Sequence, residues 1–136
     1  MKKIAAFSIF ILFLNCNTMN KNQEKKPISL ENTTWVWQYT IQNSEKIESK
    51  NKDVFTITFN KDIINIGTDC NTMSGNFTIK ENNFELGMLM STKMYCMDSQ
   101  ERIFSNMLSN SKNIEWNDKE LQLKSDKTGT MFFVKK

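Results

Sequence analysis

Alternation of apolar and polar residues with a period of two is the feature that most restricts the fold of this chain. Successive side chains of a β-strand point to opposite faces, so a strand with one buried face shows this period. The clearest run covers residues 35–41, and we expect its large apolar members to share one face: Trp35, Trp37, Tyr39 and Ile41. Further runs of this kind fall at residues 55–59, 63–66, 77–79, 84–86, 114–116, 121–123 and 131–134. Short polar segments separate neighbouring runs, which predicts antiparallel hairpins.

One segment, residues 98–109, has the period of a helix instead. Its apolar residues recur at the spacing of one helical face: Ile103, Phe104, Met107 and Leu108. Asp98 and Glu101 stand three positions apart at its start, which predicts a capping box with Asp98 as the N-cap. The pattern predicts an α+β, mostly β fold: an antiparallel curved sheet or partial barrel of about eight strands, about five before the helix and three after. We expect the one amphipathic helix to cover an open end or face of this sheet.

The N-terminal residues have the composition of a bacterial export signal. Lys2 and Lys3 precede an apolar run at residues 4–14, which spans roughly 16 Å as a helix and is too short for a hydrocarbon core of about 30 Å. The run stops just before Cys16, as in a lipobox, although the two residues before the cysteine are larger than usual. We therefore expect a lipoprotein signal peptide at residues 1–15 and a diacylglycerol on the thiol of Cys16. The alternative is ordinary signal cleavage, with Cys16 incidental.

The residues after this cysteine indicate a tether and then a domain. Residues 16–29 are polar and contain the only proline of the chain, Pro27. Such a segment buries too little apolar surface to offset its ordering entropy, so we expect it to be flexible. Residues 30–136 then form a single domain. We expect the protein to be a periplasm-facing lipoprotein of the cell envelope. Its partner is the membrane, to which the lipid on Cys16 anchors it.

Charge and the absence of histidine argue against several function classes. The chain has a formal net charge of +3, to which Lys2 and Lys3 contribute two, so the domain offers no electrostatic footprint for nucleic acid. Without histidine, the chain lacks the commonest general base and a common zinc ligand. Two carboxylate pairs remain, which a helix cap and hairpin charges explain better. We therefore expect no enzyme, no metal site and no cofactor. The two pairs are Asp98 with Glu101 and Glu115 with Glu120.

A short motif lies between two of the predicted strands. Within residues 69–77, the order is cysteine, asparagine, three variable residues, glycine, one variable residue and an aromatic residue. Gly75 stands where the chain tightens, which predicts a positive φ or a β-bulge. Asn71 can bond its own backbone in a turn and tolerates left-handed geometry. We expect structural roles for both residues, and ligand binding by this loop is the alternative.

Two further motifs complete a resemblance. Thr92, Met94 and Cys96 follow the pattern Thr-x-Met-x-Cys, and Leu30 precedes Trp35 by five positions. In this order and spacing over residues 30–134, the three motifs resemble those of the META domain family, also called HslJ-like after a heat-inducible bacterial lipoprotein. The resemblance implies a non-catalytic, stress-associated envelope lipoprotein with an undefined molecular role. It departs from the family pattern at Asp69, where a small residue is usual.

Cys70 and Cys96 are the remaining cysteines once Cys16 is assigned to the lipid. An exported protein meets an oxidising compartment, which favours a disulfide between them. Closing a loop of this length stabilises a domain by about 3.5 kcal/mol in the chain-entropy description. Buried free thiols and a reactive pair are the alternatives, although no Cys-x-x-Cys motif supports the second.

Methionines are concentrated near the second of these cysteines. Met88, Met90, Met94 and Met97 surround Cys96 in the sequence, and Met73 follows the other cysteine. Thioethers are soft ligands suited to Cu(I), so a copper-buffering role is one interpretation. The more ordinary interpretation is that methionine fills irregular gaps where the helix meets the sheet.

Two alternatives to the stress-associated lipoprotein remain open. The first is a carrier of a small ligand or acyl chain, with Trp35, Trp37 and Tyr39 lining a pocket, although packed core is their more ordinary role. The second is a protein-interaction module of the periplasm, an inhibitor or a chaperone. The polar residues 42–53 would be its surface loop.

Overall fold

The computed structural model describes residues 28–136. The predicted signal peptide, Cys16 and most of the tether lie outside the described residues. The strands are β1 (Thr33–Gln42), β2 (Glu45–Glu48), β3 (Thr56–Asn60), β4 (Ile63–Gly67), β5 (Thr72–Lys80), β6 (Asn83–Leu86), β7 (Met90–Ser91), β8 (Asn113–Trp116), β9 (Glu120–Ser125) and β10 (Gly129–Lys135), and the helix is α1 (Glu101–Asn110). Among residues 28–136, no helix combines the length and apolar character that crossing a bilayer requires.

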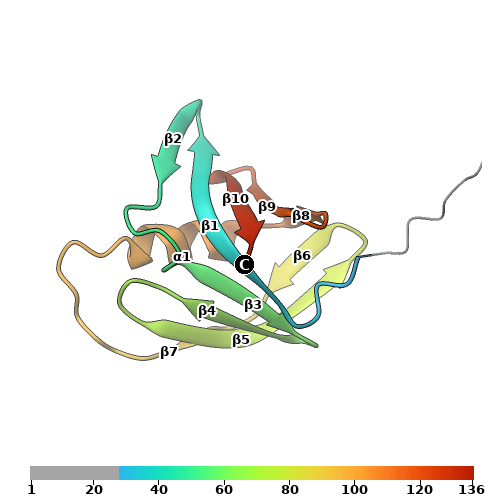
Figure 1. Cartoon of the computed structure of the whole chain (residues 1–136), viewed down its shortest axis with the longest axis horizontal. Helices are drawn as coiled ribbons and strands as arrows, with labels where there is room; N and C mark the ends of the chain where they lie inside the picture. Colours follow the sequence, from blue (N-terminus) through green and yellow to red (C-terminus); the bar gives the residue numbers. More distant parts are fainter. Residues whose placement is uncertain (1–27) are drawn as a thin grey trace, which may run out of the picture.

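The strands form a closed antiparallel barrel (Figure 1). Its order is β1-β3-β4-β5-β6-β8-β9-β10, and the pairing of β10 with β1 returns the sheet to its start. The predicted fold class is therefore confirmed, with a barrel that is closed rather than partial. Two short strands, β2 and β7, were not predicted; they pair with β1 and β5.

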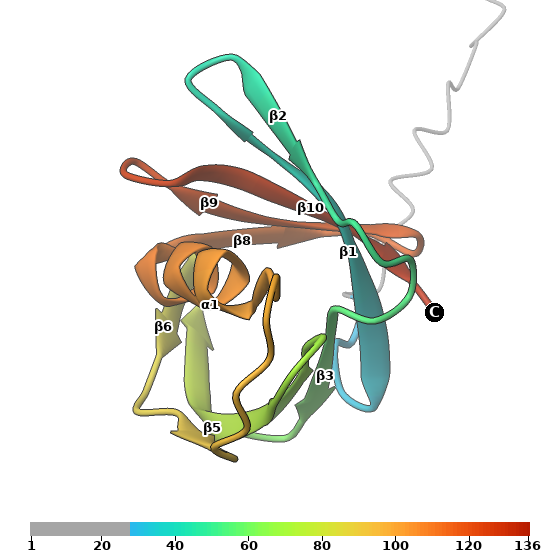
Figure 2. The same cartoon turned by 90° about the vertical axis from the view of Figure 1, so that its left-hand side faces the viewer.

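One seam of the barrel is much thinner than the others. Strands β6 and β8 share a single register pair, Asn83 with Asn113. Two backbone hydrogen bonds flank it, from Phe84 N to Lys112 O and from Ile114 N to Asn82 O, each 2.8 Å long. The helix lies between these two strands in the sequence, and Figure 2 shows it at the opening of the barrel beside them. The chain therefore leaves the sheet at this seam to cover the opening.

Aromatic side chains fill the interior behind the helix. The ring of Phe104 from α1 lies 5.1 Å from that of Phe55 and 6.4 Å from that of Phe133, measured between centroids. Trp37 packs edge-on against Phe55 at 5.4 Å. Trp35 and Trp37 are both fully buried in this core. Both belong to the main cluster of buried side chains, so the packed-core interpretation of these two residues is correct.

A β-bulge corrects the predicted face of the first strand. The register between β1 and β10 shifts between Trp37 and Tyr39. After the shift Thr40 points inward, where its hydroxyl accepts a 3.0 Å hydrogen bond from Trp37 Nε1. Tyr39 instead stacks on Phe132 at 4.7 Å, on the outside of the sheet. The prediction of one shared aromatic face is therefore wrong beyond Trp37, because one extra residue in the strand reverses every later side chain.

The helix exists as predicted, but its start is different. It begins at Glu101 with Gln100 in the N-cap position, and that residue makes no side-chain capping bond. Asp98 lies before the helix with a φ of 61° and is exposed, so the predicted Asp98–Glu101 capping box is wrong. Phe104 is buried, as the pattern predicts, whereas Ile103 is exposed.

Candidate functional site

Part of the sequence motif comes together with other polar residues at one end of the barrel. Three segments meet there: the turn between β4 and β5, residues 92–100, and the first residue of α1. Six side chains connect them by hydrogen bonds, and we call this set the motif clasp: Thr68, Asp69, Asn71, Thr92, Ser99 and Glu101.

Asn71 is the centre of the motif clasp. Its side-chain oxygen accepts 2.7 Å hydrogen bonds from Met94 N and from Thr92 Oγ1. Its side-chain nitrogen donates to Met94 O at 3.1 Å and to Glu101 Oε1 at 3.0 Å. Asn71 is buried, and its φ is not positive. Its side chain does not bond to its own turn, as expected from the sequence, but to a segment more than twenty residues away.

Glu101 is the functional residue of this site that sequence reasoning misplaced. Its Oε2 atom accepts from Asn71 N at 2.7 Å and from Thr68 Oγ1 at 2.5 Å. The carboxylate therefore holds the turn between β4 and β5, and it does not cap its own helix. The only signal in the sequence was an acidic residue at the helix start, which has a local explanation that competes with this distant one.

Asp69 provides the helix start with its acceptors. Its two carboxylate oxygens accept from Ser99 Oγ at 2.5 Å and from Gln100 N at 2.8 Å. Gln100 in turn accepts from Lys50 N at 2.7 Å and donates to Glu48 O at 3.0 Å. The residue that departs from the family pattern is thus used to fix the N-terminus of α1, where a carboxylate also opposes the helix dipole favourably.

The predicted disulfide between Cys70 and Cys96 is present. The two Cα atoms are 5.8 Å apart and the cysteines are 26 positions apart in the sequence. The alternative of buried free thiols is therefore wrong. The bond ties the segment after β7 to the turn between β4 and β5, which Asn71 and Glu101 also hold. The disulfide and the motif clasp therefore fix the same turn.

Gly75 has a different role from the predicted one. It lies within β5 opposite Ile64 in an unbroken register, without a bulge or a positive φ. A Cβ atom at this position would lie 2.6 Å from the backbone oxygen of Met88 and 2.9 Å from Leu89 Cδ2. The glycine therefore permits the chain after β6 to cross closely over β5.

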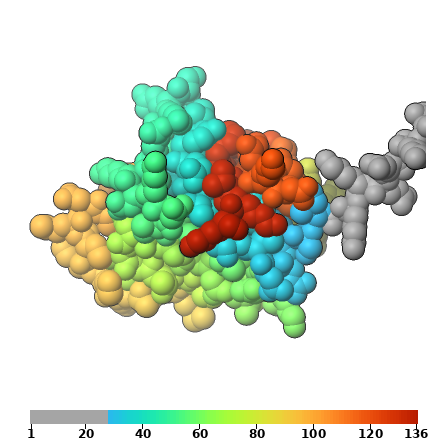
Figure 3. All heavy atoms as spheres, in the orientation of Figure 1, coloured from blue at the N-terminus to red at the C-terminus, as the bar shows by residue number. Residues whose placement is uncertain are grey.

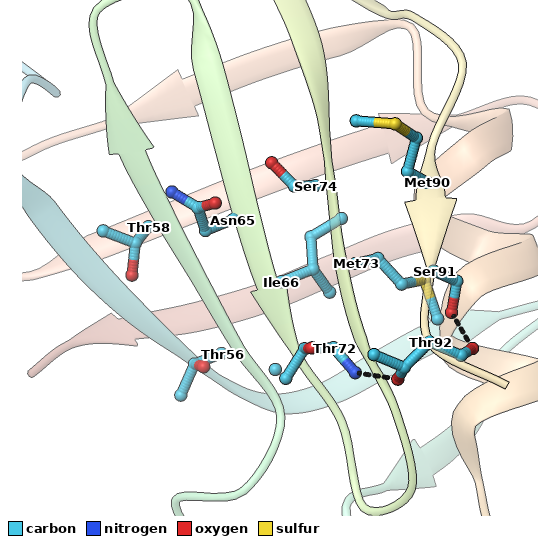
Figure 4. Close-up of a pocket in the computed structure, with 11 residues that line it drawn as sticks. Thr56, Thr58, Asn65, Ile66, Thr72, Met73, Ser74, Met90, Ser91 and Thr92 are labelled. Atoms are coloured by element: carbon cyan, nitrogen blue, oxygen red, sulfur yellow. Dashed lines mark hydrogen bonds between the residues drawn. The ribbon is translucent and has the colours of Figure 1, made fainter. Parts of the chain in front are cut away.

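A shallow groove of about 480 Å³ lies on the outer face of β3, β4, β5 and β7 (Figure 4). Hydrogen bonds from Thr72 N to Thr92 Oγ1 and from Ser91 Oγ to Thr92 O fix its rim, at 3.2 and 2.8 Å. The lining is mainly short and polar, and it contains no charged side chain. It comprises Thr56, Thr58, Asn65, Ile66, Gly67, Thr72, Met73, Ser74, Met90, Ser91 and Thr92. Of the predicted motif residues the groove includes Thr92, while Trp35 lies in the core.

Beyond the rim of the groove, the chain exposes a series of apolar side chains. We call residues 87–97 the methionine loop; its exposed large hydrophobic side chains are Met88, Met90, Met94, Tyr95 and Met97. Part of this segment forms the outer rim of the molecule in Figure 3, in yellow and orange. The prediction that methionines fill gaps here is wrong for these four, because they face solvent. It holds for Met73, which is buried against the core.

The carboxylate pairs considered as catalytic candidates have no common site. Glu101 belongs to the motif clasp and Asp98 is exposed. Glu115 forms a 2.6 Å ion pair with Lys124 across the β8–β9 hairpin, and Glu120 is exposed at the start of β9. Glu115 and Glu120 therefore lie as surface charges on the β8–β9 hairpin.

Comparisons with known proteins give the following matches. The family model described as META domain matches residues 28–136. An NMR structure of a protein from Burkholderia xenovorans has a TM-score of 0.66 at 21% identity, over 79% of this chain and 83% of the other. A crystal structure of a DUF4847-family protein from Bacteroides vulgatus has a TM-score of 0.57 at 17% identity, over 78% and 93% of the two chains. At such identities the two structures show the same fold and nothing further. No curated protein matches the chain.

Proposed function

The chain belongs to the META domain family, and we propose that it is a non-catalytic, HslJ-like lipoprotein of the bacterial cell envelope that supports the cell under stress. Its partner is a membrane, reached through the lipid on Cys16, and it uses neither a cofactor nor nucleic acid. The META domain is the folded part that this anchor keeps at the membrane surface.

The hydrogen bonds of the motif clasp support the non-catalytic part of this proposal. Asn71 and Glu101 are two chemically capable side chains of the motif clasp, and they bond to each other. Both oxygens of Glu101 and both polar atoms of Asn71 are occupied by hydrogen bonds within the motif clasp. A general base needs a free lone pair directed at a substrate, so groups bonded in this way serve architecture better than proton transfer.

The N-terminal sequence carries the localisation. Lys2 and Lys3, the apolar run and Cys16 have the order of a lipoprotein signal. Each acyl methylene that enters the bilayer contributes about 0.8 kcal/mol, so several chains on one cysteine anchor a protein stably. The oxidising compartment implied by this signal agrees with the disulfide between Cys70 and Cys96.

Metabolic labelling tests the anchor. The full-length chain, produced in bacteria fed an alkyne-tagged palmitate, should carry the label and sediment with membranes. Cys16→Ala should lose the label and appear in the soluble fraction, whereas the neighbouring control Asn17→Ala should keep both. Membrane sedimentation of unlabelled Cys16→Ala would contradict lipid anchoring.

Heat survival tests the stress role. Deleting the gene from its native bacterium should lower survival after heat shock, and the wild-type gene should restore it. Cys16→Ala should fail to restore survival at equal expression, because the domain then acts away from the membrane. Full rescue by that variant would separate the stress role from the anchor, and unchanged survival of the deletion strain would remove the stress role.

Protein interaction is a second candidate, which the exposed apolar surface of the methionine loop favours. Apolar side chains gathered on a surface mark contact sites more often than isolated ones do. The β1–β2 hairpin, whose turn and second strand belong to the polar segment 42–53, extends beyond the barrel in Figure 2, but β2 is charged and mostly exposed. A photo-crosslinker at Tyr95 should capture a defined envelope protein in cells, and one at Lys46 should not. The carrier alternative has less support, because aromatic rings fill the barrel interior.

A further inference from the structure

The methionine loop gathers exposed thioethers with a density that the rest of the domain does not have. The exposed fractions are 91% for Met88, 74% for Met90, 62% for Met94 and 78% for Met97. All four lie within ten consecutive positions. The other methionines of residues 28–136 are buried: Met73, Met107 and Met131 are 8%, 2% and 1% exposed.

The backbone of this loop is held by contacts that involve no methionine side chain. Gly87 N donates to Asn76 O at 2.8 Å, and Thr92 N donates to Thr72 O at 3.2 Å. Asn71 binds both backbone groups of Met94, and the disulfide fixes Cys96. A chemical change at the thioethers therefore leaves the bonds that position the loop intact.

We propose that the methionine loop is an oxidant-reactive modification site, which takes up hypochlorous acid or a related two-electron oxidant by conversion of its four methionines to sulfoxides. The thioether sulfur gains a bond to oxygen and loses two electrons. The O–Cl bond of hypochlorous acid breaks, its chlorine is reduced to chloride, and its proton is released to water. One oxidant molecule is consumed per sulfoxide, and the process needs no other reactant.

Competing groups in the domain are less available to the oxidant. Thiols react readily in proteins, but Cys70 and Cys96 are joined as a disulfide. Oxidation susceptibility then follows exposure, which favours the loop methionines over the three buried ones. The proposal is independent of the lipid on Cys16, since the loop and the buried methionines belong to the same domain.

Oxidation would change the surface of the domain without unfolding it. A sulfoxide is polar where the thioether is apolar, so four of them convert the exposed apolar side chains of the loop into hydrogen-bond acceptors. The same change at Met107 or Met131 would place a polar group in the core, which is costly without a partner. Exposed methionines react here at a position where the fold tolerates the product, and sulfoxide reductases can reverse the change.

Graded oxidation of the folded protein tests the proposal. The full chain with Cys16→Ala, which has no thiol outside the disulfide, receives one to four molar equivalents of hypochlorous acid and is then quenched with free methionine. Peptide mass spectrometry should find sulfoxide at the four loop methionines at more than ten times its level at Met73, Met107 and Met131. In denaturant this difference should disappear. Comparable oxidation of both groups in the folded protein, or preferential chlorination of Tyr95, would overturn the proposal.

A pair of variants separates the loop from the core. The quadruple variant M88L/M90L/M94L/M97L keeps apolar side chains of similar size and should consume four equivalents fewer of oxidant. The control Met131→Leu should consume as much as the parent. Oxidation of the Cys16→Ala chain with four equivalents should leave its melting temperature within a few degrees of that of the unoxidised protein. Loss of cooperative unfolding at that dose would contradict the claim that the fold tolerates the sulfoxides.

Discussion

The barrel interior and the motif clasp are held together by different kinds of interaction. The interior is mainly apolar, with the rings of Trp37, Phe55 and Phe104 in mutual contact. The motif clasp joins irregular segments through an amide and two carboxylates, whose partners are mostly backbone groups and hydroxyls.

This difference determines how each region responds to sequence change. In the interior an apolar side chain of similar volume largely satisfies the packing, because apolar contact has no direction. In the motif clasp each oxygen and nitrogen has an assigned partner, so even an isosteric substitution leaves a polar group unpaired. The two regions should therefore lose stability by different mechanisms, which the following substitutions separate.

Removal of the helix ring from the core should have the largest effect. Phe104→Ala empties the space between Phe55 and Phe133, and we expect a loss of about 3–5 kcal/mol in the free energy of unfolding. The matched control is its neighbour Ile103, which is 46% exposed, so Ile103→Ala should cost well under 1 kcal/mol. Urea denaturation measures both. Equal losses would mean that the helix does not seal the interior.

Removal of the disulfide should come next. The double variant Cys70→Ser/Cys96→Ser should lose about 3.5 kcal/mol, because the unfolded chain regains the entropy of an open loop. The far-ultraviolet circular dichroism spectrum should keep its β character, since the barrel pairing does not depend on this bond. An unchanged melting temperature would show that the motif clasp alone suffices to hold the segment.

A substitution that removes one charge from the motif clasp should have an intermediate effect. Glu101→Gln replaces an acceptor oxygen by an amide that faces other donors, and should cost about 2 kcal/mol. Glu115→Gln, which removes only a surface ion pair with Lys124, should cost less than 1 kcal/mol.

Hydrogen exchange locates this effect. The amides of Asn71 and Met94 should lose protection in Glu101→Gln, while those of the β9–β10 hairpin keep it. Uniform loss of protection across the barrel would contradict a local role for the carboxylate.

The smallest effect should come from an exposed pair near the barrel rim. The hydrogen bond from Lys46 lowers the pKa of Glu48 below its ordinary value. A lowered carboxyl pKa contributes stability above the unfolded-state pKa, and this contribution is lost as the pH falls through the folded-state value. Because both side chains are exposed to solvent, Glu48→Gln should leave the melting temperature at neutral pH almost unchanged. Carbon-detected NMR titration of Glu48 measures the lowered pKa, and an unshifted value would mean that the pair is not formed in solution.

The fold could be predicted from sequence wherever one side of a strand is buried. The runs around Phe55, Ile64 and Leu121 are correct because a local alternation reports directly on burial. The prediction failed at Tyr39, because a bulge depends on the strand that pairs with it and leaves no mark in the local pattern.

The site was predictable only in its parts. The motif indicated that Asn71, Gly75, Thr92 and Met94 matter, and the compartment indicated the disulfide. The partners of Glu101 and Asp69 were not predictable, because they lie about thirty residues away and a local capping explanation competed with them. The exposure of the methionine loop was also missed, since an apolar residue in an irregular segment has no period that reveals its direction.

The sequence by itself determined the eight strands of the barrel, the helix and the aromatic interior, and it favoured the pairing of Cys70 with Cys96. Each of these rests on residue chemistry or on a period of a few positions, and none requires knowledge of distant segments. Only the tertiary structure decided the closure of β10 on β1, the hydrogen bonds of the motif clasp and the outward direction of the methionine loop. These depend on which remote groups lie within about 3 Å of one another, and that is fixed when the whole barrel closes.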